Sequence, residues 1–435
     1  MSQYKYEIFF LALFLIVPMI VLITLRNRRL IKPLMAAAVI FILFIQHFFD
    51  INFVSMEGYR GTVRGFEITV IDLIILTLFF TVLLSRNIKK RFVIPGILPS
   101  LLYIFCSILS IHFSVEQKFP VYGYFVIFQF IRGLIFYWTF YHLIKDESDY
   151  QFLINILIMC ALINSIVALQ HRYVFHLHRI RGLFGHSNIL GAYSNMLAMF
   201  FLVIYRERIA KRNMLILFVA LFSVGTTVLT ISRGSIIALG IGMILLLSTI
   251  FLGKAELSAK KISASIIIIM AISIIWFRAG DRILDRWITP NPAGDALRAQ
   301  LNRIAMKFAD ENIFGCGLNN FSSAARVYIP NAPPVHGIYT LTLGEMGYIG
   351  LLAFMMIWVR FLLIGAKQFF VKKTSLISSC VKGLALGCLI LLANSTQDDH
   401  PRRTAIMYTS MVYWAYIAKG ENILKKKPDP IQQKT

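Results

Sequence analysis

Three short segments each combine a basic side chain with glycine or other small residues beside a long apolar run. They are residues 181–188 (RGLFGHSN), 232–234 (SRG) and 336–350. The planar guanidinium of arginine binds phosphate through two parallel hydrogen bonds, and a neutral imidazole can take a proton from a hydroxyl near pH 7. These residue types indicate a site where arginines bind an anion and a histidine acts as a base.

Arg233 lies in a tight turn between two apolar runs, so its guanidinium is held near the hydrocarbon boundary. An unpaired charge is costly there, which favours an anion as its partner. Ser235 and the free N–H groups at the start of the next helix would add to such a site. Arg181 has a similar place, and Gly182 and Gly185 would let a ligand approach the backbone closely. The simpler alternative is that Arg233 faces water.

His336 follows two prolines and opens an apolar run. A lone histidine is more often structural than catalytic. It stands at the end of residues 278–337, the longest loop predicted on the non-cytoplasmic side of the membrane. Arg181 and Arg233 are expected on the same side, which favours the catalytic interpretation. We therefore predict Arg181, Arg233 and His336 as catalytic residues.

The elements that must position these residues are membrane helices. The chain has 435 residues, 58% of them hydrophobic and 15% charged, and its mean hydropathy is +0.71. This composition excludes an ordinary soluble enzyme, which carries roughly 25% charged residues, as well as a disordered chain or a disulfide-rich module. Since about 20 apolar residues span a bilayer, we predict spans at residues 7–25, 33–50, 68–84, 92–112, 121–144, 151–171, 189–205, 213–231, 235–252, 262–277, 338–364, 376–394 and 404–418.

The predicted fold is an all-α polytopic membrane protein with about 12–14 transmembrane helices, in which residues 1–435 form a single integral membrane domain. Clusters of lysine and arginine fall in alternate loops, which assigns those loops and the C-terminus to the cytoplasmic side. Residues 278–337 then form one long outside loop. Within it, residues 295–309 are expected to form an amphipathic helix, with Leu297, Leu301, Ile304 and Phe308 at helical spacing.

The outside loops are unusually rich in arginine. By this topology they carry two lysines, 118 and 307, and fourteen arginines, 60, 64, 172, 179, 181, 233, 278, 282, 286, 298, 303, 326, 402 and 403. One explanation is compositional accident together with contacts to lipid phosphates. The other is a binding surface for a phosphorylated substrate. Nucleic acid is disfavoured as a partner, despite the net charge of +23, because these arginines lie on loops between membrane spans.

Two further observations concern ionisable residues. Asp72 and Arg132 lie inside apolar runs, where charged groups are usually paired, and a structural or a substrate role remains open for them. The histidines at 171, 176, 178 and 186 do not have the spacing of a standard zinc motif, and the five cysteines contain no CxxC pair. No metal or cofactor is predicted.

At these segments the chain resembles the O-antigen ligase and polymerase family of bacterial inner membranes. The similarity follows the chain in order: residues 181–188 before a helix, the Arg233 turn, an arginine-led helix with a Gly-x-Gly turn (residues 298–321, with Gly315 and Gly317), and residues 336–350 with Glu-x-Gly. Two positions depart from the family pattern, Gly337 where asparagine is common and Asn302 where tryptophan is common.

The resemblance implies a metal-independent glycosyltransferase without a cofactor, acting at the periplasmic face of the inner membrane. Its donor would be a glycan linked to undecaprenyl diphosphate. Its acceptor would be lipid A–core for a ligase or a lipid-linked glycan for a polymerase. By this resemblance, the substrate-binding residues for the donor diphosphate and the acceptor would be Arg181, Arg233, Arg298, Asn188, Tyr339 and Glu345, with the arginines binding the diphosphate and His336 close to the acceptor.

The ligase is favoured over the polymerase, because one outside loop dominates and the loop at 171–188 is short. A transporter or flippase of lipid-linked sugars is the alternative from another class. A transporter would tend to show internal repeats and polar residues at mid-membrane, whereas here the polar residues collect at one face.

Overall fold

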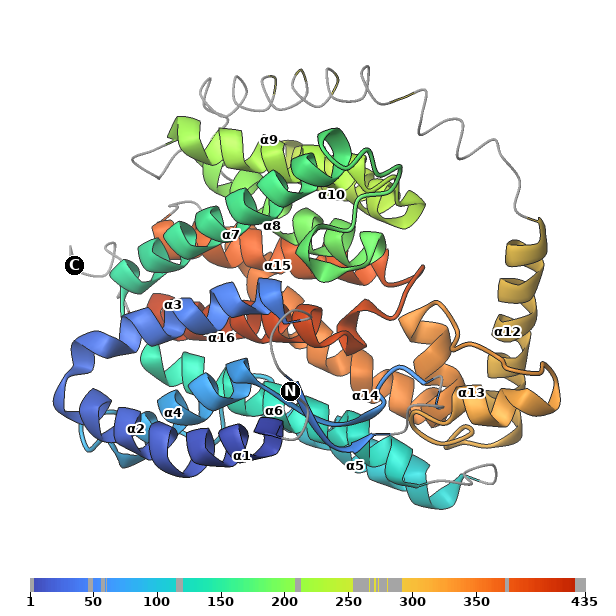
Figure 1. Cartoon of the computed structure of the whole chain (residues 1–435). Coiled ribbons are helices and arrows are strands. Elements are labelled where there is room, and N and C mark those ends of the chain that lie inside the picture. Colours follow the sequence, from blue (N-terminus) through green and yellow to red (C-terminus); the bar gives the residue numbers. More distant parts are fainter. Residues whose placement is uncertain are drawn as a thin grey trace, which may run out of the picture. The chain divides into compact units, whose positions relative to one another are not determined.

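The computed structural model describes residues 4–45, 50–55, 59, 61–114, 120–207, 213–252, 266, 270, 273, 280, 292–371 and 375–426. Six helical segments in this part of the chain are long and apolar enough to cross a membrane: Tyr4–Arg26, Val121–Leu143, Glu147–Tyr173, Ser187–Glu207, Ile338–Phe369 and Leu376–Asn394. Shorter apolar helices cover Val70–Leu84, Ile97–Phe113, Asn213–Leu229 and Arg233–Ser248. The chain is an α-helical, multi-pass membrane protein, as its sequence predicts (Figure 1).

The predicted segments coincide with helices at every position but one. The exception, residues 262–277, lies outside the described residues except for 266, 270 and 273. The segment predicted at 33–50 ends early: its helix stops at Phe41 and a strand begins at Asp50. The long apolar runs therefore locate the helices well, and they fail where a helix gives way to extended chain.

The described residues belong to two compact units. The first comprises Met1–His142, Thr289–Val359 and Ser395–Met411, and the second Leu143–Ile288, Arg360–Asn394 and Val412–Thr435. The first unit contains α1 (Tyr4–Leu11), α2 (Val17–Arg26), α3 (Ile31–Phe41), β1 (Asp50–Ser55), β2 (Gly65–Thr69), α4 (Val70–Leu84), α5 (Ile97–Phe113), α6 (Val121–Leu143), α12 (Pro292–Glu311) and α13 (Phe321–Ala324). The second contains α7 (Glu147–Tyr173), α8 (Ser187–Glu207), α9 (Asn213–Leu229), α10 (Arg233–Leu252) and α15 (Leu376–Asn394). Residues of α14 (Ile338–Phe369) and α16 (Thr404–Lys426) contribute to both.

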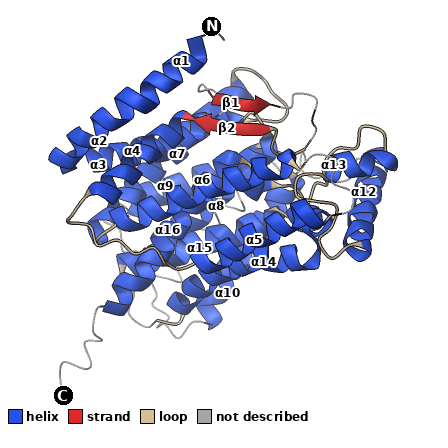
Figure 2. Cartoon of the chain, turned by 90° about the horizontal axis from the view of Figure 1, so that it is seen from below, coloured by secondary structure: helices blue, strands red, loops and turns tan. Residues whose placement is uncertain are grey.

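A two-stranded antiparallel hairpin, β1–β2, is an element that the sequence did not predict (Figure 2). Ile51 pairs with Ile68, and Asn52 pairs with Glu67. The segment between the strands is attached to Asn319: its Oδ1 accepts from the backbone N–H of Thr62 at 3.2 Å, and its Nδ2 donates to the Val63 carbonyl at 2.8 Å. The hairpin connection is thus fixed by a contact more than 250 residues away in sequence, which no local pattern reveals.

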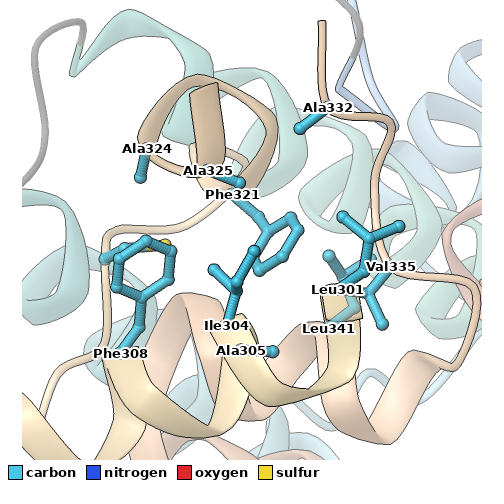
Figure 3. Packing of buried hydrophobic residues seen from close by; sticks show 11 residues of the cluster. Leu301, Ile304, Ala305, Phe308, Phe321, Ala324, Ala325, Ala332, Val335 and Leu341 are labelled. Carbon is cyan, nitrogen blue, oxygen red and sulfur yellow. The ribbon is translucent and has the colours of Figure 1, made fainter. Parts of the chain in front are cut away.

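The amphipathic helix α12 packs on the rest of its loop through one apolar face. Leu301, Ile304 and Phe308 project from α12 toward Phe321 and are nearly fully buried (Figure 3). Leu297, which the spacing placed on the same face, is 36% exposed instead, because the helix contacts the cluster only through its later turns. The same cluster includes Ala332, Val335 and Leu341, so it holds the chain on both sides of residue 336.

Helix α14 is interrupted at Gly347, whose φ of 65° and ψ of −170° are not helical. The break lets the loop before α13 bind to the helix backbone: the N–H of Cys316 donates to the Gly344 carbonyl and the N–H of Gly317 donates to the Glu345 carbonyl, both at 2.9 Å. A Cβ on Gly347 would lie 2.0 Å from the Ile313 carbonyl oxygen. The Gly-x-Gly turn and the Glu-x-Gly segment, recognised separately in the sequence, therefore form one structural contact.

Helix α8 is the centre of the second unit. It contacts α9, α10 and α15, and every residue from Ile189 to Arg206 is buried. Small residues allow α15 to come close to it: a Cβ on Gly383 would lie 3.0 Å from the Phe200 carbonyl oxygen, and one on Gly387 would lie 3.0 Å from that of Met196. Close backbone packing through small residues is typical of helices in membranes.

Asp72 and Arg132, which the sequence placed inside apolar runs, are paired with each other in the first unit. Nη1 of Arg132 lies 2.6 Å from Oδ2 of Asp72, and the backbone N–H of Thr69 donates to the same oxygen at 2.7 Å. The hydroxyl of Tyr408 donates to Oδ1 of Asp72. Three partners therefore satisfy the Asp72 carboxylate inside the unit, which gives this pair a structural role in joining α4, α6 and α16.

Candidate functional site

His336 lies in the first unit, directly before α14, and its backbone is held from both sides. Val335 is buried in the α12 cluster. On the other side the N–H of Ile338 donates to the Ser395 carbonyl at 3.0 Å, and a Cβ on Gly337 would lie 2.8 Å from the Thr396 carbonyl oxygen. Glycine at position 337 is therefore required by the close approach of the chain between α15 and α16. The imidazole itself remains exposed on this fixed backbone.

Charged side chains from two other elements act on the His336 imidazole. Partial desolvation lowers its pKa below the usual 6.5, and the positive charges of Arg298 and Arg403 lower it further against the opposing effect of Asp398. Because protonation is disfavoured, the neutral base form predominates at pH 7. The electrostatics are those required of a group that accepts a proton.

Arg298 and Tyr339, two of the predicted substrate-binding residues, lie on the helices α12 and α14 of the first unit. Arg298 lies on α12, one turn before Leu301, with its guanidinium exposed and 3.8 Å from the carboxylate of Asp295. Tyr339 lies in the first turn of α14 and is partly buried. Both residues belong to the same unit as His336.

Glu345 is fully enclosed. Its carboxylate pairs with Nη1 of Arg402 at 2.5 Å, and both side chains are buried. Its carbonyl oxygen accepts from Ser110 Oγ at 2.7 Å as well as from the Gly317 N–H. The sequence interpretation made Glu345 a substrate-binding residue, but the contacts give it the role of fixing the break in α14 to the segment that carries Arg402.

An acidic pair beside Arg402 was not recognised from the sequence. Asp399 is buried, and its Oδ1 accepts from Nε and Nη2 of Arg403, both at 2.9 Å. Burial raises the pKa of Asp399 to about 7, because desolvation outweighs the favourable charge of Arg403. The sequence signal for this pair was two consecutive acidic residues, 398 and 399, on an outside loop rich in arginine. Of the two, Asp398 acts on the pKa of His336.

Arg181 and Asn188 lie in the second unit, at the turn that enters α8. Gly182 and Gly185 have φ of 55° and 64°, so only glycine fits this turn without strain. Arg181 is exposed. Asn188 accepts through Oδ1 from Nη2 of Arg179 at 3.1 Å, which assigns its side chain to holding the neighbouring arginine.

Arg233 is the first residue of α10, also in the second unit, and is half-buried. The turn before it is tight: the N–H of Ile231 donates to the Val228 carbonyl, and the N–H of Ile236 donates to the Ser232 carbonyl at 3.0 Å. Ser232 and Ser235 are buried beneath it. A guanidinium at the start of a helix has the chemistry of an anion-binding position. The Ser235 hydroxyl, which was expected to add to this position, is buried and donates to Ser232 Oγ at 3.1 Å instead.

The seven predicted site residues thus divide between the units. His336, Arg298, Tyr339 and Glu345 belong to the first, and Arg181, Arg233 and Asn188 belong to the second. In the part of the chain that the structure describes, no group of three or more His, Cys, Asp or Glu side chains is arranged to hold a metal ion. The arrangement offers an imidazole base in one unit and exposed or half-buried guanidinium groups in both.

Comparison with known proteins gives no relative: no protein family model and no curated protein matches this chain.

Proposed function

We propose that the protein is a membrane glycosyltransferase that moves a glycan from an undecaprenyl-diphosphate donor to a sugar hydroxyl, most specifically an O-antigen ligase whose acceptor is lipid A–core. The observation that carries the proposal is His336, whose backbone is fixed on both sides and whose pKa is lowered by desolvation and by the charges of Arg298 and Arg403. A proton acceptor among guanidinium groups suits a reaction that deprotonates a hydroxyl and releases a phosphate.

In the proposed reaction the acceptor oxygen forms a bond to the anomeric carbon of the donor sugar, and the bond from that carbon to the diphosphate oxygen breaks. The hydroxyl proton passes to the neutral imidazole of His336. The bonding electron pair leaves with undecaprenyl diphosphate, whose negative charge Arg181 and Arg233 stabilise. Since the donor is already activated, the reaction needs no nucleotide or metal ion from the protein.

The proposal includes a membrane arrangement. The protein has twelve to fourteen transmembrane helices in a bacterial inner membrane, and residues 278–337 form its periplasmic loop. The alternation of lysine- and arginine-rich loops supports this orientation. The described helix α12, with its exposed polar face, supports a loop that is solvent-exposed on one side.

The experiment is deletion of the gene followed by analysis of the surface polysaccharide and the lipid-linked intermediates. A ligase predicts lipid A–core without long chains, together with accumulated lipid-linked polymer. Single repeats on the core identify a polymerase instead. Unchanged surface polysaccharide with unchanged lipid-linked intermediates contradicts both.

A further inference from the structure

A continuous set of hydrogen bonds lies beneath the Arg233 turn. Asn195 of α8 accepts through Oδ1 from Thr227 Oγ1 at 2.9 Å and donates through Nδ2 to the Ser235 carbonyl at 2.7 Å. Its side chain thereby links α9, on one side of the turn, to the first turn of α10 on the other. Asn195 is fully buried, so both of these bonds form away from solvent.

The Ser235 hydroxyl extends this set to a fourth helix. Its Oγ accepts from Nδ2 of Asn394, in α15, at 3.2 Å, and donates to Ser232 Oγ at 3.1 Å. Thr230 Oγ1 accepts from the N–H of Ser232 at 3.2 Å. Buried polar groups that satisfy one another specify a single arrangement, because any displacement leaves a donor or acceptor unpaired in a low-dielectric interior.

The packing around Ser235 leaves little freedom. A Cβ on Gly191 would lie 2.3 Å from Ser235 Oγ and 2.7 Å from Ser235 Cβ, so the Ser235 side chain packs directly against the α8 backbone at this glycine. Glycine at this position allows Asn195, one turn later on α8, to reach the backbone of Ser235. The start of α10 is thus seated directly on α8.

The turn itself contains an unfavourable backbone conformation. Ile231 has a φ of 51°, a left-handed value that a β-branched residue rarely adopts. Such a conformation is strained and persists only when the surrounding structure determines it. Ile231 stands two residues before Arg233, and the hydrogen bonds of Asn195, Thr227 and Ser235 are among the contacts that hold the turn.

We propose that Asn195 is a positioning residue that sets the direction of the Arg233 guanidinium through the first turn of α10. The inference rests on the proposed function, which assigns a donor diphosphate to Arg233. Thr227 fixes the amide of Asn195, and Asn195 fixes the Ser235 carbonyl. None of these side chains contacts substrate; they determine where the guanidinium of Arg233 can lie.

The test compares Asn195→Ala and Thr227→Val with two conservative variants, Thr227→Ser and Ser223→Ala. Thr227→Ser keeps the hydroxyl that donates to Asn195. Ser223→Ala removes a buried hydroxyl of α9 that donates to the Val219 carbonyl of its own helix. Each purified variant is measured for thermal unfolding, binding of undecaprenyl diphosphate, glycan transfer, and hydrogen exchange of the peptide that contains residues 229–237.

Asn195→Ala and Thr227→Val should weaken undecaprenyl diphosphate binding and speed hydrogen exchange of the turn, whereas Thr227→Ser and Ser223→Ala should match the parent. Transfer should fall by up to about 10²-fold, the effect of a misplacement of roughly 1 Å. The losses of transfer should be non-additive. In an Arg233→Lys background, Asn195→Ala should cause little further loss, because the guanidinium that Asn195 positions is absent.

Equal fractional losses of transfer from Asn195→Ala in the parent and in the Arg233→Lys background would overturn the inference. So would unchanged hydrogen exchange of the turn. Failure of the proposed function is a separate result: the parent would bind undecaprenyl diphosphate without transferring a glycan, or would not bind it, while the exchange measurement would still report whether Asn195 holds the turn.

Discussion

The carboxylate of Glu345 lies 2.5 Å from Nη1 of Arg402, and both side chains are buried. Glu345 belongs to the helix that starts beside His336, and Arg402 belongs to the segment whose Ser395 carbonyl accepts from Ile338. The pair therefore joins the break in α14 to the chain that carries Asp398 and Asp399. Its role is to hold the surroundings of His336 in place.

Arg402→Ala should strongly destabilise the protein. Removing one partner of a buried pair leaves an uncompensated charge, which costs about 3–5 kcal/mol. The double variant Glu345→Leu with Arg402→Met should recover much of this loss, because it removes both charges. Thermal unfolding of the purified protein measures the effect. Arg326→Ala, at an exposed arginine, is the control and should unfold at the same temperature as the parent. An equally small change in the unfolding temperature of Arg402→Ala would contradict a stabilising pair.

Single cysteines should report the proposed orientation. All five native cysteines are buried, and a parent in which they are replaced has no other thiol that could react with the reagent. Cysteines introduced at the exposed positions Gln300 and Gln397 should react with a membrane-impermeant thiol reagent in intact spheroplasts. One at exposed Asn87 should react only after permeabilisation. Labelling of Asn87→Cys but not Gln397→Cys in intact spheroplasts would reverse the orientation.

Arg233→Lys should lose roughly 10²-fold or more in transfer while the protein still folds. Lysine keeps the charge but cannot present two parallel N–H groups to a phosphate. Arg326→Lys, at an exposed position of the same residue type, should keep full activity. Transfer rates and unfolding temperatures on the same samples separate the two effects. Full activity of Arg233→Lys would reduce the role of this residue to charge alone.

The pH dependence of kcat/KM should show an acid limb at a pH below the ordinary histidine value. Desolvation, Arg298 and Arg403 lower the pKa of His336, so the neutral base persists to lower pH and activity falls only when the imidazole is protonated. Arg298→Gln removes a charge that lowers this pKa and should move the limb to higher pH. Asp398→Asn removes the opposing charge and should move it to lower pH.

Asp399 must be separated from His336 in that measurement. The pKa of Asp399 is raised to about 7, so this carboxyl titrates in the same region. An Asp399→Asn variant keeps an oxygen that can accept from Arg403 and removes the titration. The acid limb reports titration of Asp399, and not of His336, if it disappears in Asp399→Asn and stays at the same pH in Arg298→Gln and Asp398→Asn.

Much of the fold follows from the long apolar runs of the sequence, as the helix predicted at 213–231 and found at Asn213–Leu229 illustrates. The hairpin β1–β2 could not be predicted in this way. The connection between its strands is held by Asn319, far away in sequence. Strand β1 directly follows the apolar run at 33–50, so its first residue was included in the predicted span. Local patterns identify elements, whereas contacts between distant residues decide how they end.

The same limit applies to the candidate site. The predicted topology placed Arg402 with the other outside-loop arginines, and the family resemblance placed Glu345 with the substrate-binding residues. The pairing of the two is visible only in three dimensions. Gly337 and Gly347 were noticed as sequence features, and the structure supplies their reasons in the Thr396 and Ile313 carbonyl oxygens. Asn195 sits in an apolar run, where its polarity was the available signal of a special role.

The most direct test of the account measures donor affinity and glycan transfer on the same purified His336→Ala protein, beside the parent. The donor is a glycan linked to undecaprenyl diphosphate, and the acceptor is lipid A–core. If His336 is the general base, the parent should transfer the glycan, and the variant should bind the donor with near-parent affinity. Its transfer should be reduced by about 10²–10⁴-fold, the usual contribution of a general base. Near-parent transfer by a folded His336→Ala protein that still binds the donor would contradict the role of His336, and absence of transfer by the parent would contradict the proposed function.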